Sequence, residues 1–298
     1  MMHVLVNAHA GDFQTNDDRL RRLRQALRDH GIDAKLITPD DGETLEDCAE
    51  RLLQNGADPL VAAGGDGTIA ALAGPCYRAG TRLGIIPMGT FNYFARAHGI
   101  SQDLDRAVAL LAQQPERDVA PGKVNGRIFL NNLSIGVYPT ILQEREDIYA
   151  RYGRSRAAAY WSVLKALVRR PRSLKLRLDL DGKTQELSTP LAFIAASAYQ
   201  LDEFGLDDRD ALRNGQFPIF IAPQVTRRAL LHTAWRLSLG KAVKGPDYRV
   251  LTARNIEITP EQSKVLVACD GEKINMDAPL RIHLPDRPLR LIALEQDV

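Results

Sequence analysis

The stretch Gly64-Gly65-Asp66-Gly67-Thr68 constrains the fold of this chain more than any other. An apolar run at residues 59–63 precedes it, and a small-residue helical pattern starts at Ile69. A strand, a glycine turn and a helix in this order direct backbone N–H groups and the positive end of a helix at a phosphate. Glycines let phosphate oxygens approach the backbone, because no Cβ stands in the way. The stretch predicts a phosphate-binding turn, with an ordinary turn as the alternative.

Two side chains of this turn carry polar chemistry. Thr68 can cap the following helix or bond a phosphate oxygen. Asp66 is not expected to bind a phosphate directly, because both groups are negatively charged. Its candidate roles are therefore Mg²⁺ ligand, base or turn former.

The first third of the chain alternates apolar runs with helical patterns. Strands are expected at 4–7, 34–38, 60–63 and 83–86, and helices at 20–27, 45–53, from the turn to Leu72, and at 102–113. This rhythm predicts a parallel sheet covered by helices. Ligands of such sheets bind beyond the carboxyl ends of the strands. Asn7, Thr38, the glycine turn and residues 87–92 all follow strand ends, so we expect them along one edge.

Three phosphate-binding patterns compete in this region. A P-loop is excluded, because Arg177 stands where Gly182-Lys183-Thr184 would require a first glycine. Gly65-x-Gly67-x-x-Ala70 fits the relaxed dinucleotide pattern, but no Asp or Glu occurs at 69–101 to hold the ribose. The third pattern combines the first turn with Pro87-Met88-Gly89-Thr90-Phe91-Asn92. Two adjacent glycine turns would hold a nucleotide triphosphate from both sides.

The pattern changes after Pro121-Gly122 to short apolar or alternating runs, at 123–124, 128–133, 174–180, 191–196, 217–222, 249–259, 264–268, 280–284 and 289–294. Asp181-Gly182 predicts a tight hairpin. We therefore expect an α/β nucleotide-binding domain with a parallel sheet over residues 1–120. An all-β domain, resembling an antiparallel β-sandwich, should follow over 121–298. The active site is expected in the cleft between the two domains.

Two basic segments, 151–172 and 227–244, interrupt the expected strands. Both contain aromatic residues and lack Asp and Glu. One interpretation is a pair of helices that pack apolar faces on the sheet and expose basic faces to solvent. The other is a surface that contacts anionic lipid headgroups, as a peripheral membrane protein would.

Composition excludes several function classes. The formal net charge of +2 and the absence of a recognition motif argue against nucleic-acid binding. Three cysteines without a Cys-x-x-Cys pair argue against a disulfide framework or a zinc ribbon. No Gly-x-Ser-x-Gly elbow or His-Glu-x-x-His motif is present. Without an apolar run of membrane-spanning length or a signal peptide, we expect a cytoplasmic protein with peripheral contact at the inner membrane face. No pattern defines the oligomeric state.

Five motifs together resemble the diacylglycerol kinase catalytic domain family, which includes bacterial lipid kinases and sphingosine kinases. They are the turns at 64–68 and 87–92, Asn7-Ala8-His9-Ala10-Gly11 as a variant of an opening Asn-Pro-x-x-Gly turn, Phe129-x-Asn131-x-x-Ser134-x-Gly136, and Asp270-Gly271-Glu272. The motifs occur in the family's order over nearly the whole chain. Tyr93 departs from the pattern, because the family usually has Asp at this position.

The resemblance implies an ATP- and Mg²⁺-dependent lipid kinase that phosphorylates a lipid hydroxyl, of diacylglycerol or a related acceptor. The residues it assigns to the nucleotide are Asn7, Thr38, Gly64, Gly65, Asp66, Gly67, Thr68, Gly89, Thr90 and Asn92, with Asp66 also on the metal. One carboxylate would take the proton of the acceptor hydroxyl. Glu272 is favoured over Asp270 for this role, and Asp66 is a third candidate. Without the resemblance, residues 270–272 would be an acidic hairpin turn.

Two other functions are compatible with these residues. The Gly-Gly-Asp-Gly turn also occurs in NAD kinases, so an NAD-kinase-like small-molecule kinase is one alternative. A non-catalytic regulator that binds a nucleotide or a lipid is the other, with Tyr93 as the sign of lost activity. The intact carboxylates Asp66, Asp270 and Glu272 favour an enzyme.

Overall fold

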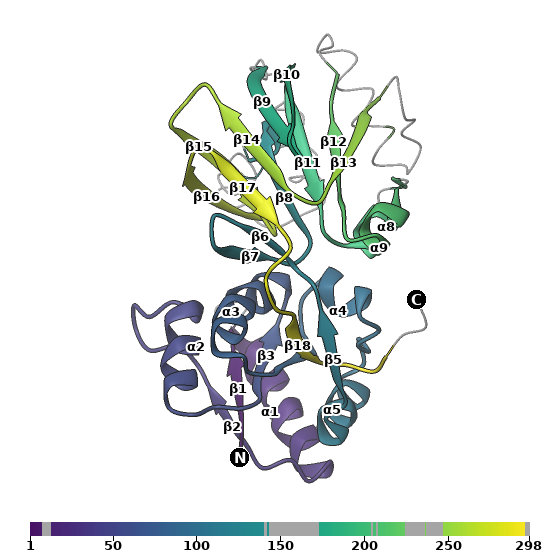
Figure 1. Cartoon of the computed structure of the whole chain (residues 1–298). Helices are drawn as coiled ribbons and strands as arrows, with labels where there is room; N and C mark the ends of the chain where they lie inside the picture. The colour runs from purple at the N-terminus through teal and green to yellow at the C-terminus, as the bar shows by residue number, and fades with distance from the viewer. Residues whose placement is uncertain are drawn as a thin grey trace. The chain divides into compact units, whose positions relative to one another are not determined.

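A computed structural model describes residues 1–7, 13–139, 142, 173–203, 205–206, 208–223, 236 and 247–295 (Figure 1). Contacts divide the chain into two units, Met1–Pro121 with Pro285–Val298, and Gly122–Leu284. Apart from Arg236, the basic segments 151–172 and 227–244 lie outside the described residues, as do residues 8–11 of the opening turn. No helix in the described ranges has both the length and the apolar character needed to cross a membrane.

The first unit contains a six-stranded sheet with the strand order β2-β1-β3-β4-β18-β5. Its strands are β1 (Met2–Val6), β2 (Ala34–Ile37), β3 (Leu60–Gly64), β4 (Leu83–Pro87), β5 (Glu116–Val119) and β18 (Leu289–Ile292). All of them run parallel except β5, which pairs antiparallel with β18. The near-continuous burial of β1, β3 and β4 is typical of a parallel sheet with both faces covered.

Helices cover this sheet, as the sequence predicts: α1 (Phe13–Asp29) and α5 (Leu104–Gln113) on one face, α2 (Leu45–Gln54) and α3 (Asp66–Ala79) on the other (Figure 1). Thr44 caps α2, since its Oγ1 accepts the Asp47 N–H at 3.1 Å and donates to the Asp47 carboxylate at 2.6 Å. The α3 helix continues past the expected end at Leu72 to Ala79. Gly80 caps its C-terminus in the left-handed conformation, with a φ of 69°. A short helix, α4 (Tyr93–Ala97), follows the second glycine turn.

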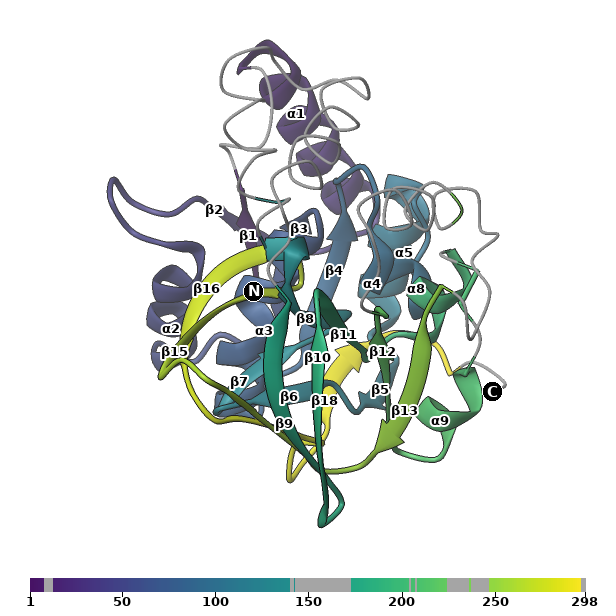
Figure 2. The same ribbon diagram turned by 90° about the horizontal axis from the view of Figure 1, so that it is seen from above.

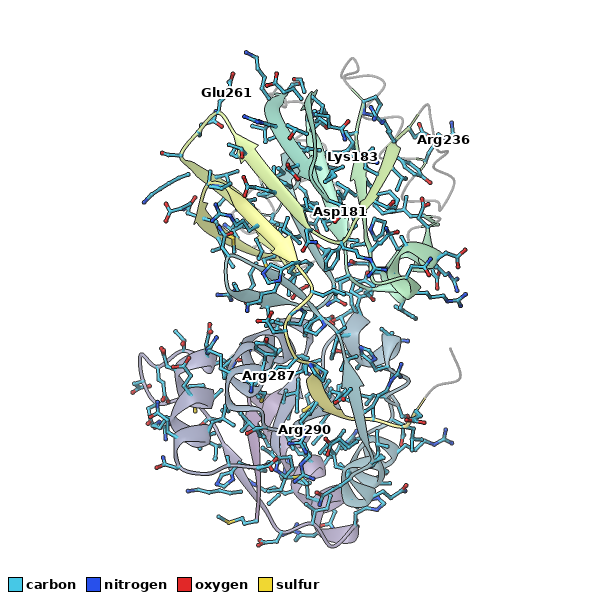
Figure 3. All side chains as sticks on the ribbon, viewed as in Figure 1. Asp181, Lys183, Arg236, Glu261, Arg287 and Arg290 are labelled. Carbon is cyan, nitrogen blue, oxygen red and sulfur yellow. The ribbon has the colours of Figure 1, made fainter. Side chains whose placement is uncertain are left out.

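The last strand belongs to the first unit, although the sequence placed residues 289–294 with the second domain. β18 lies between β4 and β5, and Leu289, Leu291 and Ile292 are fully buried there. Arg290 donates to the Gly80 carbonyl at 3.1 Å and to the Glu116 carboxylate at 2.9 Å. Figure 3 labels Arg287 and Arg290 at this end of the chain. Apolar periodicity identifies such a strand but does not reveal which sheet it joins.

The second unit is built from two six-stranded antiparallel sheets, with the orders β10-β9-β14-β17-β6-β7 and β13-β12-β11-β8-β15-β16. Buried residues from both sheets form one core, so the expected sandwich is confirmed. The strands are β6 (Gly122–Val124), β7 (Arg127–Phe129), β8 (Asn132–Gly136), β9 (Leu174–Leu180), β10 (Lys183–Thr189), β11 (Leu191–Ala195), β12 (Phe217–Ile221), β13 (Arg249–Ala253), β14 (Ile256–Pro260), β15 (Lys264–Cys269), β16 (Glu272–Asp277) and β17 (Leu280–His283). Two short helices accompany them, α8 (Ala198–Glu203) and α9 (Arg209–Arg213).

Three hairpins turn on an Asn-Gly or Asp-Gly pair, at Asn125-Gly126, Asp181-Gly182 and Asp270-Gly271. Both residues of each pair have positive φ, which is the type I′ geometry favoured in two-residue hairpins. The hairpin expected at Asp181 is therefore confirmed, and it joins β9 to β10, which run side by side in Figure 2.

The carboxylates of the two aspartate turns, Asp181 and Asp270, bind backbone N–H groups at points where an expected strand is interrupted. The run 249–259 divides into β13 and β14, and Asp181 accepts the N–H groups of Arg254 and Asn255 at the break. The Asn255 N–H lies 2.8 Å from the Asp181 Oδ1 and is the main cause of the lowered pKa of this carboxyl group. The run 128–133 divides into β7 and β8 in the same way, and the carboxylate at its break is Asp270.

Candidate active site

The two glycine turns lie at one edge of the first sheet. β3 ends at Gly64, which pairs with Pro87 of β4, and the Met88 N–H donates to the Gly64 carbonyl at 2.9 Å. The neighbouring strands β1 and β2 end in the same direction, with Asn7 and Thr38 directly after them. The expected alignment of these four features along the carboxyl edge is confirmed.

The glycines of the two turns are required by protein neighbours. A Cβ on Gly89 would lie 2.5 Å from the Gly65 Cα and 2.6 Å from the Asn92 Oδ1. A Cβ on Gly64 would lie 2.3 Å from the Thr68 Oγ1. These distances are shorter than van der Waals contact, so a side chain at Gly89 would force the two turns apart, and one at Gly64 would clash with Thr68 within the first turn. Close packing of the turns is therefore a second reason for glycine, beside access for a phosphate.

Asn92 shapes the second turn from within. It has a φ of 51° and is 3% exposed. Its Oδ1 accepts the Gly89 N–H at 3.0 Å, while its Nδ2 donates to the Gly89 carbonyl at 3.0 Å and to the Gln102 Oε1 at 2.7 Å. The amide is thus committed to holding the turn, and because it already binds both the N–H and the carbonyl of Gly89, the exposed residue Thr90 is what this turn offers a ligand. Sequence analysis missed Gln102, because a glutamine ten residues away carries no motif.

Thr68 has a similar internal role. It is 4% exposed, and its Oγ1 lies 3.5 Å from the Asn7 Nδ2, a long hydrogen bond that connects the end of β1 to α3. Gly65 occupies the N-cap of α3 without a side-chain cap, so Thr68 does not cap the helix. The first N–H groups of a helix have no acceptors within it, which leaves those at the start of α3 available to an anion.

Asp66 joins the two turns. As the first residue of α3 it is half-buried, and its Oδ1 accepts the Phe94 N–H at 3.1 Å, at the start of α4. Among the described residues, no group of three His, Cys, Asp or Glu side chains could hold a metal ion. Mg²⁺ in kinases is held by one or two carboxylates together with phosphate oxygens and water. A single carboxylate beside the two glycine turns fits that arrangement.

The remaining nucleotide-site candidates are open to solvent. Thr38, Gly67, Gly89 and Thr90 are exposed. Beside them, the 60% exposed Phe91 stacks on Tyr93, with ring centroids 5.4 Å apart. Tyr93 therefore brings an aromatic ring to the position where the family that this chain resembles usually has an Asp carboxylate.

Asp270, in the second unit, uses its carboxylate on backbone. Its Oδ2 accepts the Leu130 N–H at 2.7 Å, and its Oδ1 accepts the N–H groups of Asn131 at 2.7 Å and Asn132 at 3.1 Å. Its own N–H donates to the Asn132 carbonyl at 3.0 Å. Because three N–H donors already engage the two oxygens, Asp270 is less suited than Glu272 to take a proton from an acceptor.

Glu272 opens β16 on the other side of the same turn. Its side chain is exposed, and its Oε2 lies 3.7 Å from the Arg127 Nη2. Its cross-strand partner is Cys269, a core residue whose thiol pKa is raised by burial. Cys269 therefore stays protonated near neutral pH, and of the three residues 269, 270 and 272 only Glu272 presents an exposed carboxylate.

Comparison with known protein families identifies both parts of the chain. Residues 1–124 match the model of the diacylglycerol kinase catalytic domain. Residues 135–293 match the YegS C-terminal NAD kinase beta sandwich-like domain. The first 124 residues belong to the diacylglycerol kinase catalytic domain family. The resemblance expected from the five motifs is therefore confirmed, and the family implies the use of ATP.

Individual members of this diacylglycerol kinase family support the assignment. The chain is 29% identical to a diacylglycerol kinase of Staphylococcus haemolyticus over 77% of its own length and 68% of that protein. It is 28% identical to a diacylglycerol kinase of Staphylococcus aureus, over 77% of this chain and 72% of the relative. A solved structure of a diacylglycerol kinase from Bacillus anthracis shares the fold, with a TM-score of 0.69 and 21% identity over 98% of this chain and 96% of the other.

Proposed function

We propose that this chain is a lipid kinase that transfers the γ-phosphate of ATP to the hydroxyl group of a diacylglycerol-like lipid. The observation that carries the proposal is the packing of two glycine turns at one sheet edge, in a chain whose curated relatives are named diacylglycerol kinase. Phosphoryl transfer asks a protein chiefly for positioning and for stabilisation of charge. Backbone N–H groups at closely packed turns supply both.

The nucleotide phosphates bind at the carboxyl edge of the first sheet. The N–H groups at the start of α3 and the exposed residue Thr90 contact the phosphate oxygens, while Asn7 and Thr38 line the same edge. Asp66 would hold Mg²⁺, directly or through water, beside the phosphates. When bound, Mg²⁺ neutralises charge on the β- and γ-phosphates.

Glu272 accepts the proton of the acceptor hydroxyl. As the O–H bond breaks, the acceptor oxygen bonds to the γ-phosphorus, and the bond from that phosphorus to the bridging oxygen of ADP breaks. The proton passes to the Glu272 carboxylate, and ADP leaves with the electron pair. The exposed side chain of Glu272 and the backbone hydrogen bonds of Asp270 support this choice of base.

Peripheral membrane contact completes the proposal. The segments 151–172 and 227–244 carry only basic charge and include Trp161 and Trp235. Basic residues gain on the order of 1 kcal/mol each near an anionic bilayer surface. Such contact would bring the enzyme to an acceptor that resides in the membrane.

The test is a transfer assay with labelled ATP, Mg²⁺ and diacylglycerol in mixed micelles. We expect labelled lipid from the wild type and a loss of at least about 100-fold in kcat for Glu272→Gln, the scale of general-base catalysis, with ATP affinity unchanged. Glu261→Gln is the matched control, because Glu261 is an exposed carboxylate of the same unit that pairs with Lys175 at 3.1 Å. It should retain full activity. Wild-type activity in Glu272→Gln would reject Glu272 as the base.

An NAD-kinase-like activity is the second candidate, because the model matched by the second unit is described as NAD kinase beta sandwich-like. The same assay with NAD in place of lipid decides between the two. Labelled lipid without labelled NAD product supports the lipid kinase. Labelled NAD product without labelled lipid would overturn it.

A further inference from the structure

Four buried side chains of the second unit each leave one polar atom without a hydrogen-bond partner. These atoms are the Oδ1 of Asn131, the Oδ1 of Asn132, the Oγ of Ser134 and the Oγ of Ser197. The four residues are at most 5% exposed. No other buried side-chain nitrogen or oxygen in the described part of this unit lacks a partner. An unpaired buried polar atom costs about 1–3 kcal/mol, so this concentration points to a ligand or to bound water.

Strand register brings Asn132 and Ser134 together, and Asn131 is their neighbour along the chain. Asn132 and Ser134 alternate along β8, so they point to the same face of the sheet. Asn131 directly precedes that strand, and its carbonyl accepts the Ala196 N–H at 2.8 Å. The chain that continues from Ala196 leads at once to Ser197.

The α8 helix places Ser197 beside the same strand. Gln200 accepts a hydrogen bond from the Asn132 Nδ2 at 2.9 Å. Ser197 precedes Gln200 by three residues, and its carbonyl accepts the Leu201 N–H in the first turn of α8. Residues three apart on a helix are neighbours on its surface. Asn131, Asn132, Ser134 and Ser197 therefore lie on backbone segments that hydrogen bonds hold side by side, and together we call them the polar cluster.

Asp270 connects this polar cluster to the hairpin of Glu272. Its carboxylate binds the N–H groups of residues 130–132, and its N–H binds the Asn132 carbonyl. Asp270, which lies two residues before Glu272, thus fixes the backbone of Asn131 and Asn132. A ligand held by the polar cluster would lie on backbone that is connected to the proposed base by hydrogen bonds.

We propose that the polar cluster binds the uncharged headgroup of the acceptor lipid and that Asp270 is its positioning residue. This inference rests on the proposed lipid kinase function and specifies its substrate class. The asparagine oxygens accept a hydrogen bond from the acceptor hydroxyl, and the serine hydroxyls donate to ester carbonyls. Diacylglycerol carries both kinds of group.

The charges of the polar cluster argue against the other lipid classes. None of its four side chains is ionisable, and the oxygens of Asp270 are engaged by backbone N–H groups. The cationic amine of a sphingoid base would therefore lack a carboxylate partner, and the phosphate of a glycerophospholipid would lack a cationic one. A polyprenol has no ester carbonyl to receive the serine hydroxyls.

The test compares Ser134→Ala and Ser197→Ala in the micelle assay with diacylglycerol. We expect each variant to raise the KM for diacylglycerol by about 3- to 10-fold, the effect of one lost hydrogen bond, while the KM for ATP stays within about twofold of the wild type. Thr189→Val is the control: Thr189 is fully buried, and its Oγ1 lies 2.8 Å from the carbonyls of Leu191 and Ala222, either of which can accept its proton. It should lower the Tm without changing the KM for diacylglycerol.

Asn132→Asp adds a second, positive readout. A carboxylate at this position should lower kcat/KM for diacylglycerol and raise it for a sphingoid base, by at least about tenfold in the ratio of the two. If both serine variants lose only Tm and the Asn132→Asp ratio is unchanged, the polar cluster holds structural water and the inference is overturned. In that case the wild type still phosphorylates diacylglycerol. A wild type without any lipid product would instead refute the proposed function, and the inference with it.

Discussion

Gly89 illustrates at the scale of a single residue why a motif can be recognised before it is understood. The sequence suggested that glycine is needed here so that a phosphate can approach the backbone. The structure adds a second reason, because a Cβ on Gly89 would lie 2.5 Å from the Gly65 Cα. Contacts between two turns separated by some twenty residues cannot be read from either turn alone. The sequence could predict that the two turns, Asn7 and Thr38 share one sheet edge, yet the division into exposed and supporting residues needed the fold.

We expect Gly89→Ala to weaken ATP binding by at least about tenfold and to destabilise the protein by about 1–3 kcal/mol, because the added methyl group forces the two turns apart. Isothermal titration with ATP and urea unfolding measure the two effects. Gly74→Ala is the control, since within α3 its Cβ would meet the flexible side-chain ends of Arg78 at 3.3 Å and Glu46 at 3.8 Å. That change should be neutral or stabilising. Unchanged ATP affinity in Gly89→Ala would refute the packing argument.

His98 makes a prediction about pH. Burial, with a smaller contribution from the charge of Arg117, lowers the pKa of His98 from 6.5 to about 4. Its ring packs edge-on against Phe94, and its Nδ1 is buried without a partner. The unfolded chain binds a proton near pH 6.5 and the folded chain does not. The contribution of the neutral His98 to the free energy of unfolding is therefore complete above pH 6.5 and is lost as the pH falls towards 4.

Urea unfolding at pH 7 and pH 5 tests this sign. We expect the wild type to lose about 2 kcal/mol more than His98→Phe between these two pH values. His30→Phe changes an exposed histidine and should keep the wild-type dependence. An equal loss in the wild type and His98→Phe would show that His98 does not cause the effect.

At the scale of elements, the apolar strands were predictable and the polar ones were not. β10 and β16 have few apolar residues, because one face of each is solvated and each follows an Asp-Gly turn at the edge of the fold. The runs 128–133 and 249–259 looked continuous, since the carboxylates that interrupt them are remote in sequence. Asp181 was identified as a turn former, but its binding to the β13–β14 break was not predictable from the hairpin alone.

We expect Asp181→Asn to keep the β9–β10 hairpin, since Asn-Gly also favours this turn, but to weaken the contact with the β13–β14 break. Amide exchange at Arg254 and Asn255 should accelerate by about fivefold, corresponding to about 1 kcal/mol for the lost charge-assisted hydrogen bonds. Asp179→Asn is the control, because Asp179 accepts the Gly182 N–H and not those at the break. Equal acceleration in both variants would place the effect in the hairpin itself.

At the scale of the whole molecule, the two units differ in continuity. Gly122–Leu284 is one uninterrupted segment, whereas the first unit needs Pro285–Val298 to complete its sheet. Local periodicity predicted the parallel sheet and the sandwich but not this return of the chain. A chain that ends at Leu284 tests its importance.

We expect this truncated chain to lose ATP binding and the folded first unit, because three fully buried apolar side chains, worth about 1.5–3 kcal/mol each, leave the sheet. The second unit should stay resistant to limited proteolysis. A chain that ends at Glu295 keeps β18 and should bind ATP as the full chain does. ATP binding by the shorter chain would refute the requirement for β18.

The position of β18 also has a consequence for protein synthesis. A ribosome makes β4 and β5 early, then translates the entire second unit before it reaches the strand that pairs with both. Until then the nascent first unit exposes unpaired strand edges, which invite association with other chains. Nascent chains stalled before β18 should therefore depend on chaperones and be unable to bind ATP. The nucleotide site would therefore be complete only after β18 has been translated.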